Sequence, residues 1–317
     1  MTNFTYYAWN VDSASAYLNE YRRNNVCTRY NNLTRKQLLN DVPRIMTSSQ
    51  ADRYAYATLV INSNDVSQSV KNAQIQVIDQ LRKEDYLPAC NEYGRFAELG
   101  IGYIKNENNA RLWYEYCHNK GFAIGTYNYA RCLIEGIGGP TNIQLGQQLM
   151  LEATYKEYGK AMGYIAKSYI KGINGYPQDY AMAFKWYSKA ASDLDTNHTY
   201  NLAYLYFKGL GCQKDMKKAA LWFSMAARYD DIDAKIQYGK MCHHGDGVPV
   251  NYNESFKNFL EAANAGNAYA MHLLAFNYRF GLGCEKSTQQ AIYWLNKAIQ
   301  NGEEEARKTL DMIQNNK

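Results

Sequence analysis

The sequence predicts an all-α fold, an α/α solenoid in which helix–turn–helix units stack with a period of 36 residues. The main observation is a series of six glycines separated by steps of 36, 36, 37, 36 and 36 residues, namely Gly100, Gly136, Gly172, Gly209, Gly245 and Gly281. Helical spacing of large and small residues recurs on both sides of each glycine. A fixed period of this length indicates repeats that bury their apolar faces against neighbouring repeats.

The segment after each glycine predicts a helix, which we call helix B. A large residue recurs thirteen or fourteen positions after the glycine, at Trp113, Leu149, Trp186, Trp222, Phe259 and Trp294. A small residue follows four positions later, at Cys117, Ala153, Ala190, Ala226, Ala263 and Ala298. Positions i and i+4 lie on one face of a helix, so the small residue lets a neighbouring backbone approach.

The segment before each glycine predicts a second helix, which we call helix A. Its core pairs at i and i+4 are Tyr93/Ala97, Tyr129/Leu133, Ile165/Tyr169, Leu202/Tyr206, Tyr238/Cys242 and Leu274/Tyr278. A small residue follows the first member of each pair, at Gly94, Ala130, Ala166, Ala203, Gly239 and Ala275. Two helices can approach closely at such a position.

Each glycine is expected to end helix A, where the chain needs a left-handed residue. That conformation costs a residue with a Cβ atom about 1–2 kcal/mol. A phosphate-binding glycine loop is the functional alternative, but no GxxxxGK[ST] pattern and no preceding strand accompany these turns. The structural interpretation is therefore preferred.

The residues resemble a known family at this point. The run Leu202-Ala203-Tyr204-Leu205-Tyr206-Phe207-Lys208-Gly209-Leu210-Gly211, followed by Trp222 and Ala226, is similar to the Sel-one-like repeat (SLR) of the tetratricopeptide-like superfamily. Similar runs span Gly172 to Ala191 and Gly281 to Ala298. The resemblance implies a right-handed superhelix of six repeats over residues 87–302. The outer copies depart from the motif, since Leu149 replaces the tryptophan.

The flanking segments are expected to extend the array. One period before Gly100 stands Asn64, so residues 51–86 are interpreted as a degenerate repeat. Residues 1–50 are expected to hold capping helices at 11–24 and 33–47, and residues 303–317 a C-terminal capping helix. Solenoids require such caps.

Composition limits the class of protein. A net charge of +5 on 317 residues does not indicate nucleic-acid binding. No apolar run is long enough to insert into a membrane, and the N-terminus lacks the pattern of a signal peptide. Seven cysteines without a paired framework suggest reduced thiols, and hence a cytoplasmic protein.

Two motifs that could carry chemistry are weak. The run Cys242-His243-His244-Gly245-Asp246 holds zinc-ligand types, but adjacent histidines on a helix diverge and Cys242 occupies a core position. Ser168 and Lys171 match the SxxK pattern of penicillin-recognising enzymes, without the accompanying motifs. We therefore predict a protein that is not an enzyme and has no metal or other cofactor.

A column of residues on helix A is the stronger functional signal. The residue two positions after the first core residue points away from helix B, and the column consists of Arg95, Arg131, Lys167, Tyr204, Lys240 and Phe276. Neighbouring columns add Asn91, Tyr127, Tyr200, Phe207, His243, His272 and Arg279. The resemblance implies that this side lines a concave groove, with rungs about 8–10 Å apart. The alternative is an ordinary solvated helix face.

These observations predict a non-catalytic scaffold or adaptor that binds a protein or peptide segment, preferably an acidic one, in the groove. An alternative is an immunity or regulatory protein that caps a toxin or an enzyme. Such roles occur among bacterial SLR proteins, and a bacterial source is expected. A β-lactam-binding hydrolase, acylated at Ser168, is the alternative of a different class. The sequence also leads us to expect that reversing the charge of Arg131 and Lys167 leaves stability unchanged.

Overall fold

The computed structural model describes residues 49–63, 66–156, 158–191 and 196–315. In these residues the chain forms fifteen α-helices and no strand, which confirms the predicted all-α class. The expected capping helices at 11–24 and 33–47, together with Asn64 and Cys27, lie outside the described residues. The chain divides into two compact units between Tyr158 and Gly159, and each unit is described by itself.

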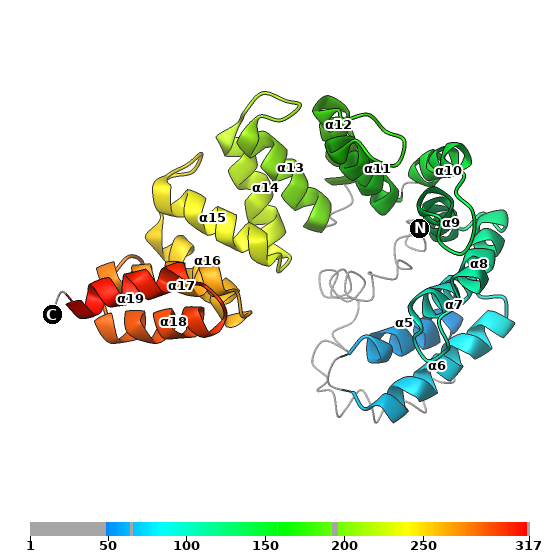
Figure 1. Cartoon of the computed structure of the whole chain (residues 1–317), viewed down its shortest axis with the longest axis horizontal. Coiled ribbons are helices and arrows are strands. Elements are labelled where there is room, and N and C mark those ends of the chain that lie inside the picture. Colours follow the sequence, from blue (N-terminus) through cyan, green and yellow to red (C-terminus); the bar gives the residue numbers. More distant parts are fainter. Residues whose placement is uncertain (1–48, 64–65, 157, 192–195, 316–317) are drawn as a thin grey trace. The chain divides into compact units, whose positions relative to one another are not determined.

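The N-terminal unit contains six of these helices, and the C-terminal unit the other nine (Figure 1). Those of the N-terminal unit are α5 (Gln50–Ile61), α6 (Gln68–Lys83), α7 (Leu87–Leu99), α8 (Glu107–Asn119), α9 (Ala123–Glu135) and α10 (Ile143–Tyr155). Those of the C-terminal unit are α11 (Gly159–Lys171), α12 (Tyr180–Ala190), α13 (Thr196–Lys208), α14 (Met216–Arg228), α15 (Ile232–His244), α16 (Tyr252–Asn264), α17 (Ala268–Phe280), α18 (Thr288–Gln300) and α19 (Glu305–Asn315).

Helices that follow one another in the sequence pack against one another within each unit (Figure 1). Odd-numbered helices from α7 to α17 are the predicted helix A, and even-numbered helices from α8 to α18 are helix B. The pair α5 and α6 precedes the first repeat, where the sequence predicts a degenerate repeat. At the other end, α19 packs on α18.

The first glycine of each turn ends helix A as predicted. Gly100, Gly136, Gly245 and Gly281 are left-handed C-caps with φ between 70° and 79°. A second glycine is also left-handed, two residues later as at Gly211 with φ 69°, or three residues later at Gly175 with φ 79°. The turn therefore needs two residues in a conformation that disfavours any Cβ atom.

The second glycine is also a point of close approach between repeats. A Cβ atom on Gly211 would lie 1.9 Å from the backbone oxygen of Tyr180, in the first turn of the preceding helix B. The same clash would occur at Gly247 with the oxygen of Met216, at 2.2 Å. Backbone-to-backbone contact at this glycine therefore sets the distance between consecutive repeats.

A column of N-caps, which our sequence reading did not identify, fixes the start of each helix B. It consists of Asn106, Asn142, Asp179, Asp215, Asn251 and Ser287. Each side chain accepts a hydrogen bond from a backbone N–H three residues on, at 2.9–3.2 Å. Each backbone N–H donates in turn to a carbonyl near the end of helix A, at 2.7–3.0 Å. Such a cap stabilises a helix by about 1 kcal/mol.

The N-caps also correct the predicted register of the helix B core. Counted from the N-cap, Phe259 is equivalent to the fully buried Phe223 and not to Trp222. The small residue that faces it agrees with this assignment, because a Cβ atom on Gly239 would meet the Phe259 ring at 2.7 Å. The most deeply buried large residue therefore stands one position after the tryptophan, as Tyr114, Tyr187 and Phe223 do.

We predict that Gly211→Ala destabilises the fold more than Gly209→Ala does. Both glycines have φ near 70°, so both variants incur the cost of a left-handed alanine. A Cβ atom on Gly209 would meet only side-chain and backbone atoms of Lys214 at 3.0 Å or more. The clash at Gly211 should add about 1–3 kcal/mol to the loss of unfolding free energy, measured by urea denaturation. Equal losses would contradict a spacing role for the second glycine.

We also predict that Phe223→Ala lowers the free energy of unfolding by about 3–5 kcal/mol, as truncations of buried aromatic residues do. Trp222→Ala should cost less, because Trp222 is only half-buried. Leu221→Ala is the control, since that side chain is 56% exposed and should change stability by less than about 0.5 kcal/mol. A larger loss at Trp222 than at Phe223 would restore the register first read from the sequence.

Candidate partner-binding surface

The predicted column on helix A lies in both units, so its members are considered unit by unit. The N-terminal unit holds Asn91 and Arg95 on α7, and Tyr127 and Arg131 on α9. The other members belong to the C-terminal unit, on α11, α13, α15 and α17. They are Lys167, Tyr200, Tyr204, Phe207, Lys240, His243, His272, Phe276 and Arg279.

In the N-terminal unit both arginines of the column are already paired. Arg95 binds Glu92 one turn earlier on α7, and its Nε donates to the carboxylate at 2.9 Å. Glu92 is fully buried. Burial raises the pKa of Glu92, and the charge and hydrogen bonds of Arg95 oppose that shift.

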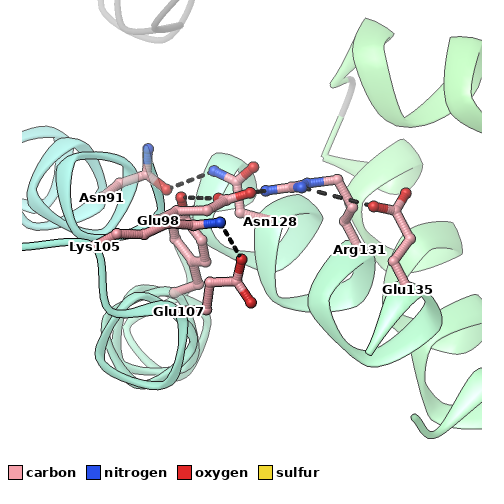
Figure 2. Close-up of polar contacts among 8 residues, drawn as sticks. Asn91, Glu98, Lys105, Glu107, Asn128, Arg131 and Glu135 are labelled. Atoms are coloured by element: carbon pink, nitrogen blue, oxygen red, sulfur yellow. Dashed lines mark hydrogen bonds and ion pairs between the residues drawn. The ribbon is translucent and has the colours of Figure 1, made fainter. Parts of the chain in front are cut away.

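Arg131 connects two repeats. Its guanidinium on α9 lies 2.6 Å from the carboxylate of Glu98 on α7 and 3.7 Å from Glu135, one turn further along α9 (Figure 2). Glu98 also accepts a hydrogen bond from the buried Tyr114 hydroxyl at 2.7 Å. The side chains of Arg131 and Glu98 are only 20% and 13% exposed. Arg131 is therefore part of the structural core of this unit.

This pairing corrects the expectation that reversing Arg131 leaves stability unchanged. The prediction treated the residue as pointing away from every packed neighbour, whereas Glu98 of the preceding repeat lies against it. Lys167 differs, because it is exposed and forms no ion pair in the described part of the chain.

We therefore predict that Arg131→Glu lowers the free energy of unfolding by about 1.5–3 kcal/mol, because it breaks charge-assisted hydrogen bonds of a partly buried ion pair. The variant would place a third carboxylate beside Glu98 and Glu135. Lys167→Glu is the matched control and should change stability by less than about 0.5 kcal/mol. Similar melting curves for the two variants would show that the Glu98 pair contributes little.

A second inter-repeat contact lies beside the first. The side chain of Asn128 on α9 donates to the side-chain oxygen of Asn91 on α7 at 2.8 Å (Figure 2). Asn91 is buried and Asn128 is half-buried. Tyr127, also predicted for the groove, packs edge to face on Tyr158 with ring centroids 5.2 Å apart.

In the C-terminal unit the column contains exposed aromatic residues and lysines without an ion-pair partner. Tyr204 and Phe276 are 39% and 44% exposed. The half-buried Lys240 places its Nζ atom 5.7 Å from the ring centre of Tyr269. Lys208 lies over both Tyr204 and Phe207, at 5.8 and 5.3 Å. These contacts hold the ammonium groups beside apolar surface while leaving them free of carboxylates.

Four other predicted residues of this unit make packing or hydrogen-bond contacts within the fold. Tyr200 and Phe207 both pack on the buried Phe223 ring. His272 forms a hydrogen bond with Thr309 at 2.9 Å. His243 contacts Tyr252 and Phe276, with ring centroids 5.2 and 6.0 Å apart, and burial lowers its pKa.

Three residues of this surface were not predicted, namely Lys208, Tyr269 and Phe280. Phe280 is 51% exposed, stacks on Phe276 at 4.6 Å and lies under the guanidinium of Arg279. Lys208 and Phe280 both stand directly before the glycine that ends helix A. A search of that column in the sequence could have found them.

The structure does not assemble either chemical motif into a site. Ser168 is 1% exposed, and its hydroxyl accepts a hydrogen bond from Asn174 at 3.0 Å. Within the described residues, no three His, Cys, Asp or Glu side chains are grouped as ligands for a metal ion. The cysteines in those ranges are free thiols, and Cys117 and Cys132 are buried.

None of the helices in the part of the chain described here is long and apolar enough to cross a bilayer.

Comparison with known proteins identifies the repeats. Chitin synthase regulatory factor 4 of Schizosaccharomyces pombe is 30% identical over 141 residues, which are 44% of this chain and 22% of that protein. Chitin synthase regulator SKT5 of Saccharomyces cerevisiae is 24% identical over 258 residues, 67% of this chain and 37% of that protein. The chain thus spans well under half of either relative.

A solved structure supports the fold. The protective antigen of uropathogenic Escherichia coli that displays an SLR fold superposes with a TM-score of 0.67 at 22% identity, over 88% of this chain and 59% of that one. The family model of the Sel1 repeat matches residues 87–116, 123–157, 159–193, 199–229, 232–267 and 268–303. The chain therefore belongs to the Sel1 repeat family.

Proposed function

We propose that this protein is a non-catalytic adaptor that binds a segment of a partner protein on the helix A face of its C-terminal unit. Membership of the Sel1 repeat family and the two relatives named as regulators of chitin synthase support an interaction role. The burial of Ser168 counts against the β-lactam-binding alternative.

One observation carries the choice of surface. Four cations on the A helices of the C-terminal unit have no carboxylate within 4.0 Å among the described residues. They are Lys167, Lys208, Lys240 and Arg279. Exposed rings lie on two of these helices, Tyr204 on α13 and Tyr269, Phe276 and Phe280 on α17. The N-terminal unit lacks this combination, since its column arginines are neutralised by Glu92 and Glu98.

The chemistry of this surface favours a segment that carries both carboxylates and apolar side chains. Each free ammonium or guanidinium group can form a charge-assisted hydrogen bond with a carboxylate. The rings beneath them provide apolar area with few rotatable bonds, which limits the entropy lost on binding. A regulator that covers part of an enzyme would use the same contacts, and the names of the relatives favour that version of the adaptor role.

The test compares peptide binding with a matched control. Fluorescent peptides that alternate Asp or Glu with Phe or Leu, and peptides of the same length with Lys in place of the acids, are titrated into the full chain by anisotropy. The double variant Lys208→Glu with Lys240→Glu should weaken the acidic peptides at least about tenfold, because it removes two charge-assisted contacts and adds repulsion.

The double variant Lys217→Glu with Lys257→Glu has the same charge change on helices α14 and α16 and should bind as wild type does. If both double variants weaken binding of the acidic peptides equally, the effect comes from the net charge of the protein and not from the proposed surface. Acidic and basic peptides that bind equally well would refute the proposed surface. A cytoplasmic location, a bacterial source and the absence of nucleic-acid partners stay predictions from the sequence.

A further inference from the structure

A pair of carboxamides stands out among the contacts of the N-terminal unit. Asn91 on α7 and Asn128 on α9 come from consecutive repeats and are joined by one hydrogen bond of 2.8 Å, from Asn128 Nδ2 to Asn91 Oδ1 (Figure 2). At the corresponding positions of the C-terminal unit stand Tyr200 with Gln237, and Ile236 with Leu273. The fold therefore does not require two amides here.

The pair leaves hydrogen-bonding capacity unused. Asn91 is 1% exposed, and its Nδ2 atom is buried without any hydrogen-bond partner. Figure 2 shows this nitrogen turned away from Asn128, while the oxygen of Asn128 is turned away from Asn91. That oxygen also has no partner within the described ranges. One donor and one acceptor thus stay open, and a buried donor without an acceptor is a cost to the fold.

Each cation beside the pair is already bound by a carboxylate. Arg95 binds Glu92. Arg131 binds Glu98 and Glu135, and the exposed Lys105 lies 2.7 Å from Glu107 (Figure 2). An anionic ligand such as nucleic acid would need cations that are not already paired. A carboxylate on the ligand would likewise find no unpaired cation, because Glu98 and Glu135 share the one guanidinium of Arg131 and leave an excess of negative charge. The open groups are one donor and one acceptor, so they match an uncharged ligand that carries both.

We propose that Asn91 and Asn128 form a binding site for the main chain of an extended polypeptide segment. In an extended strand each residue turns its N–H and C=O groups toward the same edge, where a partner can bond both. The ligand N–H would donate to Asn128 Oδ1, and the ligand carbonyl would accept from Asn91 Nδ2. A helical segment cannot bind in this way, because its backbone groups are used within the helix.

The class of ligand does not depend on how the two amides are oriented. If nitrogen and oxygen are exchanged in both side chains, Asn91 donates to Asn128 and the open groups become one acceptor on Asn91 and one donor on Asn128. The complement is again a C=O and an N–H. This site rests on the proposed function only in that the partner is a polypeptide, since it lies in the other unit and recognises no charge.

The experiment measures single backbone hydrogen bonds in a bound peptide. Random dodecapeptides displayed on phage are selected on the full chain, and the best binder is resynthesised with each amide in turn replaced by an ester. An ester removes one N–H donor and keeps the side chains. One ester should weaken binding to the wild type about five- to twentyfold, as the loss of one hydrogen bond to a buried site does.

The same peptides are then measured on Asn128→Ala, with Asn108→Ala on α8 as the control for an exposed asparagine. Asn128→Ala should weaken the parent peptide, and the sensitive ester should cost nothing further, because both changes remove the same bond. Asn108→Ala should behave as wild type. Matching melting temperatures show that both variants are folded.

Three results would overturn the proposal. In the first, the selection enriches no peptide. In the second, no ester changes the affinity for the wild type more than twofold. In the third, the sensitive ester weakens binding to Asn128→Ala as much as it weakens binding to the wild type. The two proposals can fail separately. Peptides weakened by charge reversal at Lys208 and Lys240 but not by Asn128→Ala would support the C-terminal surface and refute this site. Peptides weakened by Asn128→Ala but not by charge reversal at Lys208 and Lys240 would support this site and refute the C-terminal surface.

Discussion

Backbone contact at the second glycine of four turns, at Gly138, Gly211, Gly247 and Gly283, is the constraint on which the other repeating features depend. Gly138 and Gly211 lie against the first turn of the preceding helix B, where a Cβ atom would come within 2.1 and 1.9 Å of a carbonyl oxygen. This contact fixes the step between repeats inside each unit. Once the step is fixed, a given position of one helix A always meets the same position of the next, and side chains pair by column.

Two such pairings can be followed in the N-terminal unit. Glu98 meets Arg131, and Asn91 meets Asn128, because the members of each pair occupy facing columns of consecutive repeats. The C-terminal unit shows the first pairing again with other chemistry, since His243 contacts Phe276 at 6.0 Å. The geometry is thus shared, and the identity of the side chains decides whether a contact neutralises a charge or leaves a ring on the surface.

The sequence predicted the helices and turns well because they follow local rules. A left-handed glycine and an i, i+4 pattern act within one turn, so the period alone located α7 to α18. The register of Phe259 failed because the large residue was placed fourteen positions after Gly245, on an aromatic ring, whereas the equivalent of Trp222 stands thirteen positions after that glycine, at Asn258. The turn from Gly245 to the N-cap Asn251 is as long as the turn from Gly209 to Asp215, so counting from the cap pairs Phe259 with Phe223.

The candidate surface was harder to predict, because its properties depend on pairs that lie a full repeat apart. Arg131 belongs to a basic column in the sequence, but Glu98 stands 33 residues earlier and in another column. Whether two such residues meet depends on the step between repeats, which composition does not give. The exposed aromatic residues were found only in part, since Phe280 stands in a column that the search omitted.

The column of Glu98 explains why the two units differ. Its equivalents in the later repeats are Ile134, Ile170, Phe207, His243 and Arg279, so it contains a single carboxylate. Only the arginine that faces Glu98 can therefore be neutralised from this column. Lys208, Lys240 and Arg279 of the C-terminal unit lie against aromatic rings instead. A lysine that lies against a ring keeps most of its capacity to bind a carboxylate, because the ring lowers its freedom without cancelling its charge. The same scaffold thus presents an internally neutralised face in one unit and an unneutralised face in the other.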